Sequence, residues 1–473
     1  MNALIGRSQE IAVLKKVMDS VKPEFVAVYG RRRVGKTYLI RQFFENQFTF
    51  YLTGIANANV SVQLNNFIAT YREYDYLPDE HTPKNWFEAF ALLKRLIQRR
   101  GEELCVVFFD EMPWLDTPRS NFVMALEHFW NSYGSAKNNL KLIACGSAAS
   151  WIINKLINNH GGLHNRITKR LHIQPFTLNE TEQLLQAKKI VLERYHIAEL
   201  YSMVGGIPFY LEEIEEGLSI AQNIDRLCFS DTGLLKNEYH NLFKSLFKES
   251  DSHRAVIEVL ATKAMGLQRD EIIKLAQLPN GGNTTRVLEE LEYSGFIRRY
   301  LPFNNKLKNS LYQLADPFVL FYHQFMKNSK ARGQGVWLSF MDSAQYKTWS
   351  GYAFENTCLL HILQIKKALG ISGIYSENAS WRSRENKAQI DLLIDRKDKV
   401  ITVCEIKFSN DTFVITKEYG EKLRQKLNVF KNETKTKKSI LLAMITTFGI
   451  QPNQYSLGLV QNVISLDDLF DKA

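Results

Sequence analysis

The sequence contains few cysteines, and none of them has the spacing of a metal or disulfide motif. The five lie at positions 105, 145, 228, 358 and 404, with no C-x-x-C pair. Three of the five lie in runs that we expect to be buried strands. This distribution argues against a structural zinc and against a disulfide framework, and it is typical of reduced packing residues in a cytoplasmic protein.

Long apolar runs are also absent. No uninterrupted apolar stretch approaches 18 residues, which argues against a transmembrane helix. The first ten residues, MNALIGRSQE, lack the apolar core of a signal peptide. The composition, 45% hydrophobic and 23% charged, is typical of an ordinary soluble globular protein, and a chain of 473 residues should hold about three domains.

Acidic residues are clearly fewer than basic residues only in the second half of the chain. The net charge is +10. Residues 1–239 contain 27 Lys and Arg against 26 Asp and Glu, whereas residues 240–473 contain 33 against 24. The excess favours a polyanion, most simply nucleic acid, as the partner of the second half. A mildly basic solvated surface is the alternative.

The most informative motif that is present is GRRRVGKT, which matches the phosphate-binding P-loop pattern G-x-x-x-x-G-K-[ST]. An apolar run at 25–29 predicts the strand before it, and residues 38–44 predict the helix after it. This context favours nucleotide binding over a chance match. We expect Lys36 to reach the β- and γ-phosphates of ATP and Thr37 to hold Mg²⁺. The residues expected to surround the nucleotide phosphates are Gly30, Arg31, Arg32, Arg33, Val34, Gly35, Lys36 and Thr37.

A second apolar run, CVVFFDE at 105–111, ends in two acids. Its length and continuity predict a strand buried on both faces of a parallel sheet. Ligands of such sheets bind at the carboxyl edge. We therefore expect Asp110 to hold Mg²⁺ through its water shell and Glu111 to deprotonate the attacking water. The alternative is a core strand that ends in a solvated acidic turn.

The order of the patterns predicts four segments. Strand-like runs alternate with helices over residues 1–176, which predicts a three-layer parallel α/β core. A helical lid follows at 177–247, with a break at Gly205-Gly206-Ile207-Pro208. Residues 248–315 read as helix, helix, helix and two strands, the order of a winged helix-turn-helix. A last α/β segment, 316–473, begins with aromatic-rich helices and contains strands at 389–395, 400–408 and 438–445.

A separate group of charged residues lies in this last segment, in QIDLLIDRKDKVITVCEIKF. If the turn of the predicted hairpin centres on Asp398, Asp391 and Glu405 are opposite each other, with Cβ atoms about 5 Å apart. Lys407 shares their face and Ile406 points into the core. The two carboxylates are candidate Mg²⁺ ligands, and the lysine can orient a water or stabilise a phosphorane. The alternative is an ordinary charged face of a hairpin.

Taken together, these motifs resemble the prokaryotic AAA-type P-loop ATPases of the archaeal ATPase family, often followed by a nuclease-like domain. The likeness extends over nearly the whole chain. It rests on LIGRSQE (4–10), YGRRRVGKT (29–37), FFDEMPWL (108–115), CGSAAS (145–150), GLHNR (162–166), GGIPFYL (205–211) and YQLADPFVLFY (312–322).

The resemblance implies further residues at the nucleotide site. Gly6 and Arg7 would lie near the adenine, and Ser147 would sense the γ-phosphate. Arg166 resembles an arginine finger or sensor, although a surface arginine in a Gly/Asn-rich loop is an equally good interpretation. Gly205-Gly206 would belong to a lid motif, unless it is a simple helix break.

The group Asp391, Glu405 and Lys407 resembles the PD-(D/E)XK nuclease pattern, D-x(n)-E-x-K. Glu355 matches the helix-borne glutamate of that fold, and Gln389 would support the metal or the phosphate. Ile390 departs from the pattern, since many members carry proline there.

In the winged helix, residues 283–286 of the third helix and the wing residues Arg298 and Arg299 are the candidate DNA contacts, with a packing spacer as the alternative. The leading hypothesis is an ATP-regulated, Mg²⁺-dependent nuclease that acts on DNA or RNA. A role in defence or in mobile-element biology would be consistent with such an activity. The alternatives are a slow NTPase signalling switch and a DNA-binding regulator. A homo-oligomer is expected, because AAA-type sites usually take an arginine from a neighbour, and a membrane partner is not.

Overall fold

The computed structural model describes residues 4–76, 82–159, 161–247, 249–263, 265–385 and 388–472. The chain divides into two compact units, Met1–Pro175 and Phe176–Ala473, here called unit 1 and unit 2. None of the helices in the described part of the chain combines the length and the apolar character needed to cross a bilayer.

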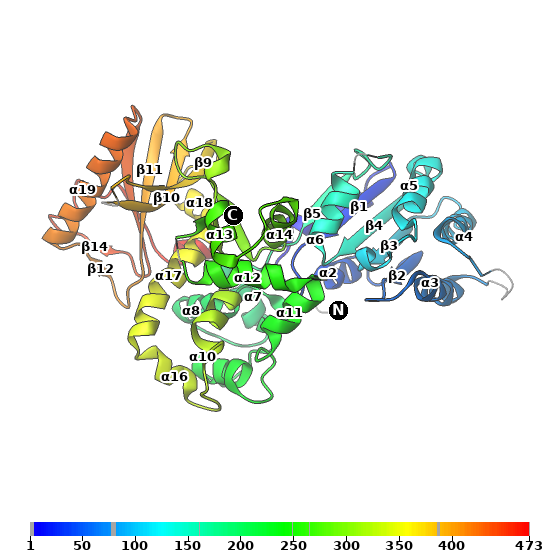
Figure 1. The fold of residues 1–473 in the computed structure, drawn as a ribbon, viewed down its shortest axis with the longest axis horizontal. Helices are drawn as coiled ribbons and strands as arrows, with labels where there is room; N and C mark the ends of the chain where they lie inside the picture. Colours follow the sequence, from blue (N-terminus) through cyan, green and yellow to red (C-terminus); the bar gives the residue numbers. More distant parts are fainter. Residues whose placement is uncertain are drawn as a thin grey trace. The chain divides into compact units, whose positions relative to one another are not determined.

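Unit 1 is built on a five-stranded sheet in the order β2-β3-β4-β1-β5, and every strand pair is parallel (Figure 1). The strands are β1 Glu24–Tyr29, β2 Phe50–Thr53, β3 Cys105–Asp110, β4 Leu140–Gly146 and β5 Lys169–His172. All residues of β3 and β4 are buried, which explains their unbroken apolar sequence. The predicted parallel α/β sheet is confirmed.

Helices connect these strands. The main ones are α1 Ser8–Met18, α2 Lys36–Phe43, α3 Val60–Tyr74, α4 Trp86–Arg99 and α5 Phe122–Ser132. Helix α4 begins where the Asn85 side chain accepts a hydrogen bond from the Glu88 amide at 3.0 Å. Because the sheet is parallel, the loops after β1, β3 and β4 lie at one edge, where the P-loop and the acidic motif meet.

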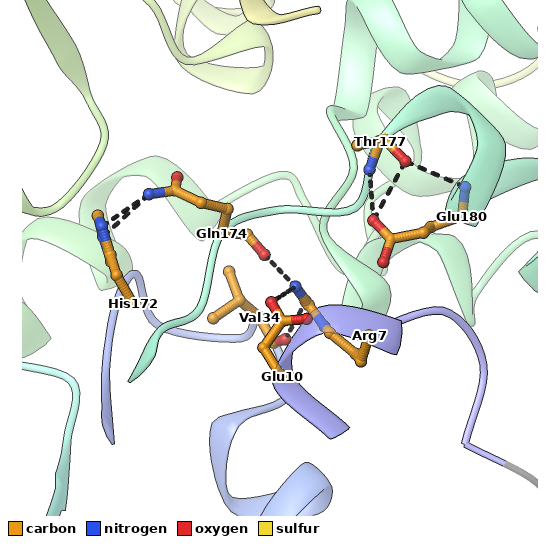
Figure 2. Close-up of polar contacts among 7 residues, drawn as sticks. All are labelled: Arg7, Glu10, Val34, His172, Gln174, Thr177 and Glu180. Carbon is orange, nitrogen blue, oxygen red and sulfur yellow. Dashed lines mark hydrogen bonds and ion pairs between the residues drawn. The ribbon is translucent and has the colours of Figure 1, made fainter. Parts of the chain in front are cut away.

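Unit 2 begins with helices, as the sequence predicts. They are α7 Leu178–Ala187, α8 Arg194–Val204, α9 Pro208–Leu211, α10 Ile220–Ile224 and α11 Glu238–Leu246. A capping box starts α7: the Glu180 amide donates to the Thr177 hydroxyl, and the Thr177 amide donates to the Glu180 carboxylate at 2.9 Å (Figure 2).

The predicted break after α8 is a point of close backbone approach. Gly205 has φ 69°, and a Cβ on Gly206 would lie 1.9 Å from the Phe176 carbonyl oxygen. Proline then occupies the first turn of α9. Only glycine fits at position 206, so close packing explains this glycine, and the lid motif and the simple helix break both remain possible interpretations of the segment.

The middle of unit 2 alternates helices with short strands. Its elements are α12 Ser250–Ala261, β6 Leu267–Gln268, α13 Arg269–Ala276, α14 Gly282–Tyr293, β7 Ile297–Tyr300 and β8 Leu311–Leu314. The strands form an antiparallel sheet in the order β6-β8-β7. The two-residue strand β6 was not predicted, because so short a strand has no detectable periodicity.

The rest of unit 2 begins with helices α15 Pro317–Phe321, α16 Val336–Met341, α17 Ala344–Leu360 and α18 Ile362–Ala368. A sheet in the order β15-β13-β11-β10-β9 follows. Its strands are β9 Ser376–Arg382, β10 Gln389–Arg396, β11 Val400–Lys407, β13 Ser439–Thr446 and β15 Asn462–Ile464, with α19 Lys417–Thr434 between β11 and β13. Strand β9, SENASWR, was missed because it is largely polar.

The hairpin of β10 and β11 has the predicted register. Leu392 pairs with Cys404 and Leu393 with Val403, which centres the turn on Asp398. Leu393 and Val403 pack in a hydrophobic core with Leu423 and Phe430 of α19. Helix α19 therefore covers one face of the hairpin near the predicted charged group.

Candidate functional sites

The P-loop of unit 1 joins β1 to α2 and depends on its two glycines. Gly30 has φ 144°, and a Cβ there would lie 2.2 Å from the Ile173 carbonyl oxygen. Gly35 has φ 86° and caps the N-terminus of α2. Between them Arg33 also has a positive φ, 70°. These conformations wrap the backbone at the start of a helix, where amide groups can bind phosphate oxygens.

Lys36 is held inside this loop. Its ammonium donates to the carbonyl oxygens of Gly30 and Arg31 at 3.0 and 2.8 Å. Only 5% of the residue is exposed, and this burial lowers the pKa of Lys36, while the charges of Glu111 and Asp110 oppose the shift. The lysine is therefore a positioned cation within the predicted phosphate cradle.

Thr37 and Asp110 meet at the carboxyl edge of the sheet. The Thr37 hydroxyl lies 2.9 and 3.1 Å from the two carboxylate oxygens of Asp110, the last residue of β3. Burial, followed by the charge of Glu111, raises the pKa of Asp110. A cation would relieve both effects, and hydroxyl and carboxylate oxygens suit Mg²⁺. The residues present therefore fit a magnesium ion.

Glu111 has a strained backbone and a fixed side chain. Its φ is 44°, in the left-handed region. One carboxylate oxygen accepts a hydrogen bond from the Ser147 hydroxyl at 2.6 Å, and the other accepts from the Ser147 amide at 3.2 Å. Ser147 directly follows β4. The structure thus brings together the predicted base and the predicted γ-phosphate sensor.

Arg7 ties the N-terminal segment to the P-loop. Its guanidinium donates to the carbonyl oxygens of Gln174 and Val34 at 2.6 and 2.8 Å and lies 3.6 Å from the Glu10 carboxylate (Figure 2). Gly6, with φ 65°, turns the chain just before it. No sequence signal identified Gln174 as a partner, because its carbonyl lies 167 residues away.

His172 is a further residue of this region that sequence reasoning missed. Its ring stacks on Tyr29 with centroids 4.7 Å apart, and the Gln174 side chain lies 2.8 Å from its Nδ1 (Figure 2). Burial, with the Lys36 charge acting in the same direction, lowers the pKa of His172. His172, an exposed residue at the end of β5, therefore forms a stacked pair with Tyr29, the residue that directly precedes the P-loop.

Among the described residues, no hydrogen bond or ion pair joins Arg166 to the other predicted residues of the ATP site. Arg166 is exposed and belongs to a turn in which its amide donates to the Leu163 carbonyl at 3.0 Å. An arginine finger that reaches a second copy and an ordinary surface arginine both require exposure. Both interpretations of Arg166 therefore stay open.

In unit 2, Glu405 is the most strongly bonded member of the second predicted group. Both its oxygens accept hydrogen bonds from α19: one from the Tyr419 hydroxyl at 2.7 Å, the other from the Lys426 ammonium at 2.6 Å. Lys407 lies 3.3 Å from the first oxygen. Burial alone would raise the pKa of Glu405, but the charges of Lys426 and Lys407 and these hydrogen bonds lower it. Tyr419 and Lys426 were not predicted.

Asp391 directly precedes Leu392, the first residue of β10 that pairs with β11, and the pairing of β10 with β9 is irregular between Ile390 and Leu393. The charge of Glu405 acts on Asp391. The Gln389 side chain donates to it at 2.5 Å. Burial raises the pKa of Asp391, and the Gln389 hydrogen bond opposes the shift. The expectation that Ile406 points into the core was wrong: Ile406 is only half-buried, while Glu405, on the face of Val403, is 7% exposed.

Glu355 of α17 completes the group. Burial, followed by the charge of Asp391, raises the pKa of Glu355 to about 8, although the charges of Arg298 and Lys407 act against the increase. Glu355 and Asp391 also line one cavity. The structure therefore brings the helix-borne glutamate to the acids of the hairpin.

This group lacks a full set of protein ligands for a metal ion but can bind one that keeps water ligands. Within the described ranges, no three His, Cys, Asp or Glu side chains are arranged to hold a metal ion. Asp391 and Glu355 have raised pKa values that a cation would relieve. Mg²⁺ usually keeps several water ligands and needs only one or two carboxylates, so these residues fit it.

The predicted nucleic-acid contacts of the middle segment divide into two sets. Asn283, Arg286 and Arg299 are exposed. Arg298 instead lines the cavity that contains Glu355 and Asp391. The expectation that both arginines lie on an outer wing is therefore wrong for Arg298, because successive strand residues point to opposite faces.

Comparison with known proteins identifies the first site. Residues 4–214 match the family described as the ATPase domain predominantly from Archaea. An uncharacterised protein of Methanocaldococcus jannaschii is 25% identical over 410 residues, which cover 86% of this chain and 88% of that protein. An uncharacterised ATP-binding protein of the same organism is 42% identical over 43 residues, 9% of this chain and 73% of the relative.

Two solved structures are also similar. The Walker-type ATPase of Pyrococcus abyssi has a TM-score of 0.48 at 20% identity, covering 68% of this chain and 96% of that one. The ORC2 protein of Aeropyrum pernix, solved as ADPNP and ADP complexes, has a TM-score of 0.43 at 14% identity and covers 72% and 96%. The family match, rather than these two likenesses, supports an archaeal-type ATPase domain that binds ATP.

Proposed function

We propose that this chain, which contains an archaeal-type ATPase domain at residues 4–214, couples ATP hydrolysis in unit 1 to a Mg²⁺-dependent phosphodiesterase in unit 2 that acts on DNA or RNA. The observation that carries the proposal is the group of Glu355, Asp391 and Glu405 with Lys407. It lies in the half of the chain with the excess of basic residues. Biological roles in defence or in mobile elements would suit this activity.

At the ATP site, we propose a role for each residue that is consistent with the geometry. Lys36 would bind the β- and γ-phosphates, while Thr37 and Asp110 would hold a magnesium ion, which would supply positive charge to neutralise the developing phosphate charge. Glu111 takes a proton from the attacking water. The water oxygen then bonds to the γ-phosphorus, and the bond between that phosphorus and the bridging oxygen breaks, leaving its electron pair on ADP.

Ser147 orients the base in this scheme. Its hydroxyl and amide each donate to one oxygen of Glu111, which leaves further lone pairs on both oxygens to accept a hydrogen bond from the water. If Ser147 also contacts the γ-phosphate, a bound triphosphate would change how Ser147 holds Glu111. The pair therefore supports hydrolysis that depends on a correctly bound triphosphate.

At the second site, Asp391 and Glu405 would hold Mg²⁺, which supplies charge neutralisation at the scissile phosphate when bound. Lys407 would orient the water. The water gives up a proton to the solvent as its oxygen bonds to phosphorus. The bond between phosphorus and one ester oxygen breaks, its electron pair stays on that oxygen, and the oxygen takes up a proton from the solvent. Lys426 and Tyr419 hold Glu405 in place through its two oxygens.

The middle of unit 2 supports a nucleic-acid partner. Its order of helix, strand, helix, helix and two strands matches a winged helix-turn-helix, and we propose that fold for residues 248–315. The exposed Asn283, Arg286 and Arg299 are the proposed phosphate contacts. The helices at 177–247 would serve as the lid, and the α/β segment 316–473 would be the PD-(D/E)XK-like domain.

One observation favours a second candidate, a switch whose C-terminal domain binds nucleic acid without cutting it. Both oxygens of Glu405 are already bonded to side chains. A metal would have to compete with Lys426, which lies 2.6 Å away. In that case the rate of ATP hydrolysis would set how long the protein stays bound to nucleic acid.

The test is cleavage of end-labelled single- and double-stranded DNA and RNA with Mg²⁺ or Mn²⁺, with and without ATP. Asp391→Asn should abolish cleavage, whereas the matched change Asp411→Asn, at an exposed aspartate in the loop after β11, should not. Lys36→Ala should remove only the response to ATP. An intact ATPase that cuts none of the four substrates would refute the nuclease and leave the switch.

A further inference from the structure

A cavity of about 850 Å³ in unit 2 has walls from two proposed domains. Arg298, Tyr300 and Gln313 line it from the proposed winged helix. On the other side its lining includes Glu355 of α17 together with Gln389 and Asp391 of β10. Two acids of the proposed phosphodiesterase, Glu355 and Asp391, therefore line the same cavity as residues of the proposed winged helix.

Arg298 is the unusual member of this wall. It pairs with Gln313 across strands β7 and β8, and its Nε donates to the Gln313 side-chain oxygen at 2.8 Å. Its two terminal nitrogens are buried, and neither has a hydrogen-bond partner among the residues that the structure describes. The neighbouring Arg299 points to the other face of the sheet and is exposed.

A buried guanidinium with two unused nitrogens is rare in a folded protein, because buried charges are almost always paired. Burial accordingly lowers the pKa of Arg298. The charge of Glu355 acts against this decrease, and Asp391 lines the same cavity, but among the described residues neither acid accepts a hydrogen bond from the two terminal nitrogens of Arg298. An oxyanion in the cavity would satisfy the two nitrogens, since the guanidinium fork matches the oxygens of a phosphate.

We propose that Arg298 binds a backbone phosphate of a single-stranded nucleic acid in this cavity, so that the winged helix contributes one residue to the C-terminal site. This proposal rests on the proposed nucleic-acid function of unit 2. The acids would bind a metal on one side of the phosphate and Arg298 would bind an oxygen on the other, an arrangement common in phosphoryl transfer.

The size of the cavity selects a single strand. A volume of about 850 Å³ is in the range of pockets that take a compact organic ligand. A B-form duplex is far larger, since its major groove alone is about 12 Å wide. One or two nucleotides of a flexible strand fit such a cavity, and an intact duplex does not.

The test measures binding, so that it does not depend on cleavage. Fluorescence anisotropy would follow labelled ten-residue oligo(dT) and oligo(rU) and a ten-base-pair hairpin, in CaCl₂. Arg298→Gln should weaken binding of both single strands roughly 10- to 100-fold, the range for losing a charge-assisted pair of hydrogen bonds. Arg298→Lys should fall between, because lysine keeps the charge and loses the fork.

Arg424→Gln, at an exposed arginine of α19, is the matched control. It removes the same charge from a position outside the proposed site and should weaken binding less than about three-fold at the same salt concentration. Equal losses in Arg298→Gln and Arg424→Gln would overturn the proposal, since they would indicate a general electrostatic effect. Binding of the hairpin as tight as that of the single strands would also overturn it.

A folding control separates binding from stability. Because the two nitrogens have no partner, Arg298→Gln should leave the melting temperature of the protein unchanged or raise it. A lower melting temperature would identify a structural role and refute the proposal. A wild-type protein that binds the strands through Arg298 but never cuts them would refute the nuclease and leave this inference intact. If the wild-type protein cuts nucleic acid and Arg298→Gln cuts equally well, the nuclease proposal would be supported and the role of Arg298 would be refuted.

Discussion

Glu355 allows a direct test of the electrostatics of the C-terminal site. Its carboxyl group lies on α17, where burial and then the charge of Asp391 raise its pKa from 4.5 to about 8. Replacing it with glutamine keeps the shape of the protonated acid and removes the charge. The variant Glu355→Gln therefore isolates the cost of ionising this group inside the folded protein.

Proton linkage gives the direction in which the ionisation of Glu355 changes stability with pH. The folded state holds the Glu355 proton more tightly than the unfolded chain, so stability falls as the pH rises from about 4.5 and the full penalty is present above about 8. A pKa of about 8 in place of 4.5 corresponds to at most about 5 kcal/mol. Partial exposure of the residue and relaxation reduce this, and we expect about 2–3 kcal/mol.

The measurement is calorimetric unfolding in EDTA at pH 5 and pH 9, which separates the transitions of the two units if they melt independently. At pH 9 the unit 2 transition of Glu355→Gln should lie about 5 °C above that of the wild type, and at pH 5 about 1 °C above it. Glu421→Gln, at an exposed position of α19, is the control and should show no such difference. A variant that is less stable than the wild type at pH 9 would refute the reasoning.

The remaining predictions concern unit 1. Glu111→Gln should leave ATP binding unchanged and lower hydrolysis roughly 10²- to 10⁴-fold, measured by nucleotide titration and phosphate release; unchanged turnover would exclude Glu111 as the base. Arg7→Ala should destabilise unit 1 by about 3 kcal/mol in denaturant unfolding, because the buried carbonyl of Val34 and the carbonyl of Gln174 both lose a charged donor. If Arg166 acts on a neighbouring copy, mixing Arg166→Ala with Lys36→Ala should restore ATPase activity that neither variant has alone, and no recovery would favour a surface arginine.

The parts of the ATP site that could be predicted are local in sequence. The P-loop requires two glycines, a lysine and a threonine within eight residues, and its strand and helix lie directly beside it. The run at 105–111 is apolar without interruption because both faces of β3 are buried. Short-range steric and burial constraints of this kind leave a clear pattern in the sequence.

Contacts between distant segments were not predictable. Gln174 binds Arg7 through its backbone carbonyl, and every residue type has a carbonyl. Tyr419 and Lys426 hold Glu405 from α19, where their spacing fits one helix face but gives no indication of which strand that face covers. Only the tertiary packing of α19 on β11 selects these partners, so no motif could mark them.

Arg298 and Arg299 show why the composite cavity in particular could not be read from the sequence. Adjacent residues of a strand face opposite sides, so one of the two arginines had to point inward. The sequence FIRRYLPF does not indicate whether that residue is Arg298 or Arg299. Pairing with Gln313 on β8 decides it. The predicted domain boundary at 315 separates Arg298 from Glu355 and Asp391, although all three line one cavity. A fragment that begins at residue 316 would therefore retain every acid of the proposed site and lack the arginine that we propose binds its phosphate.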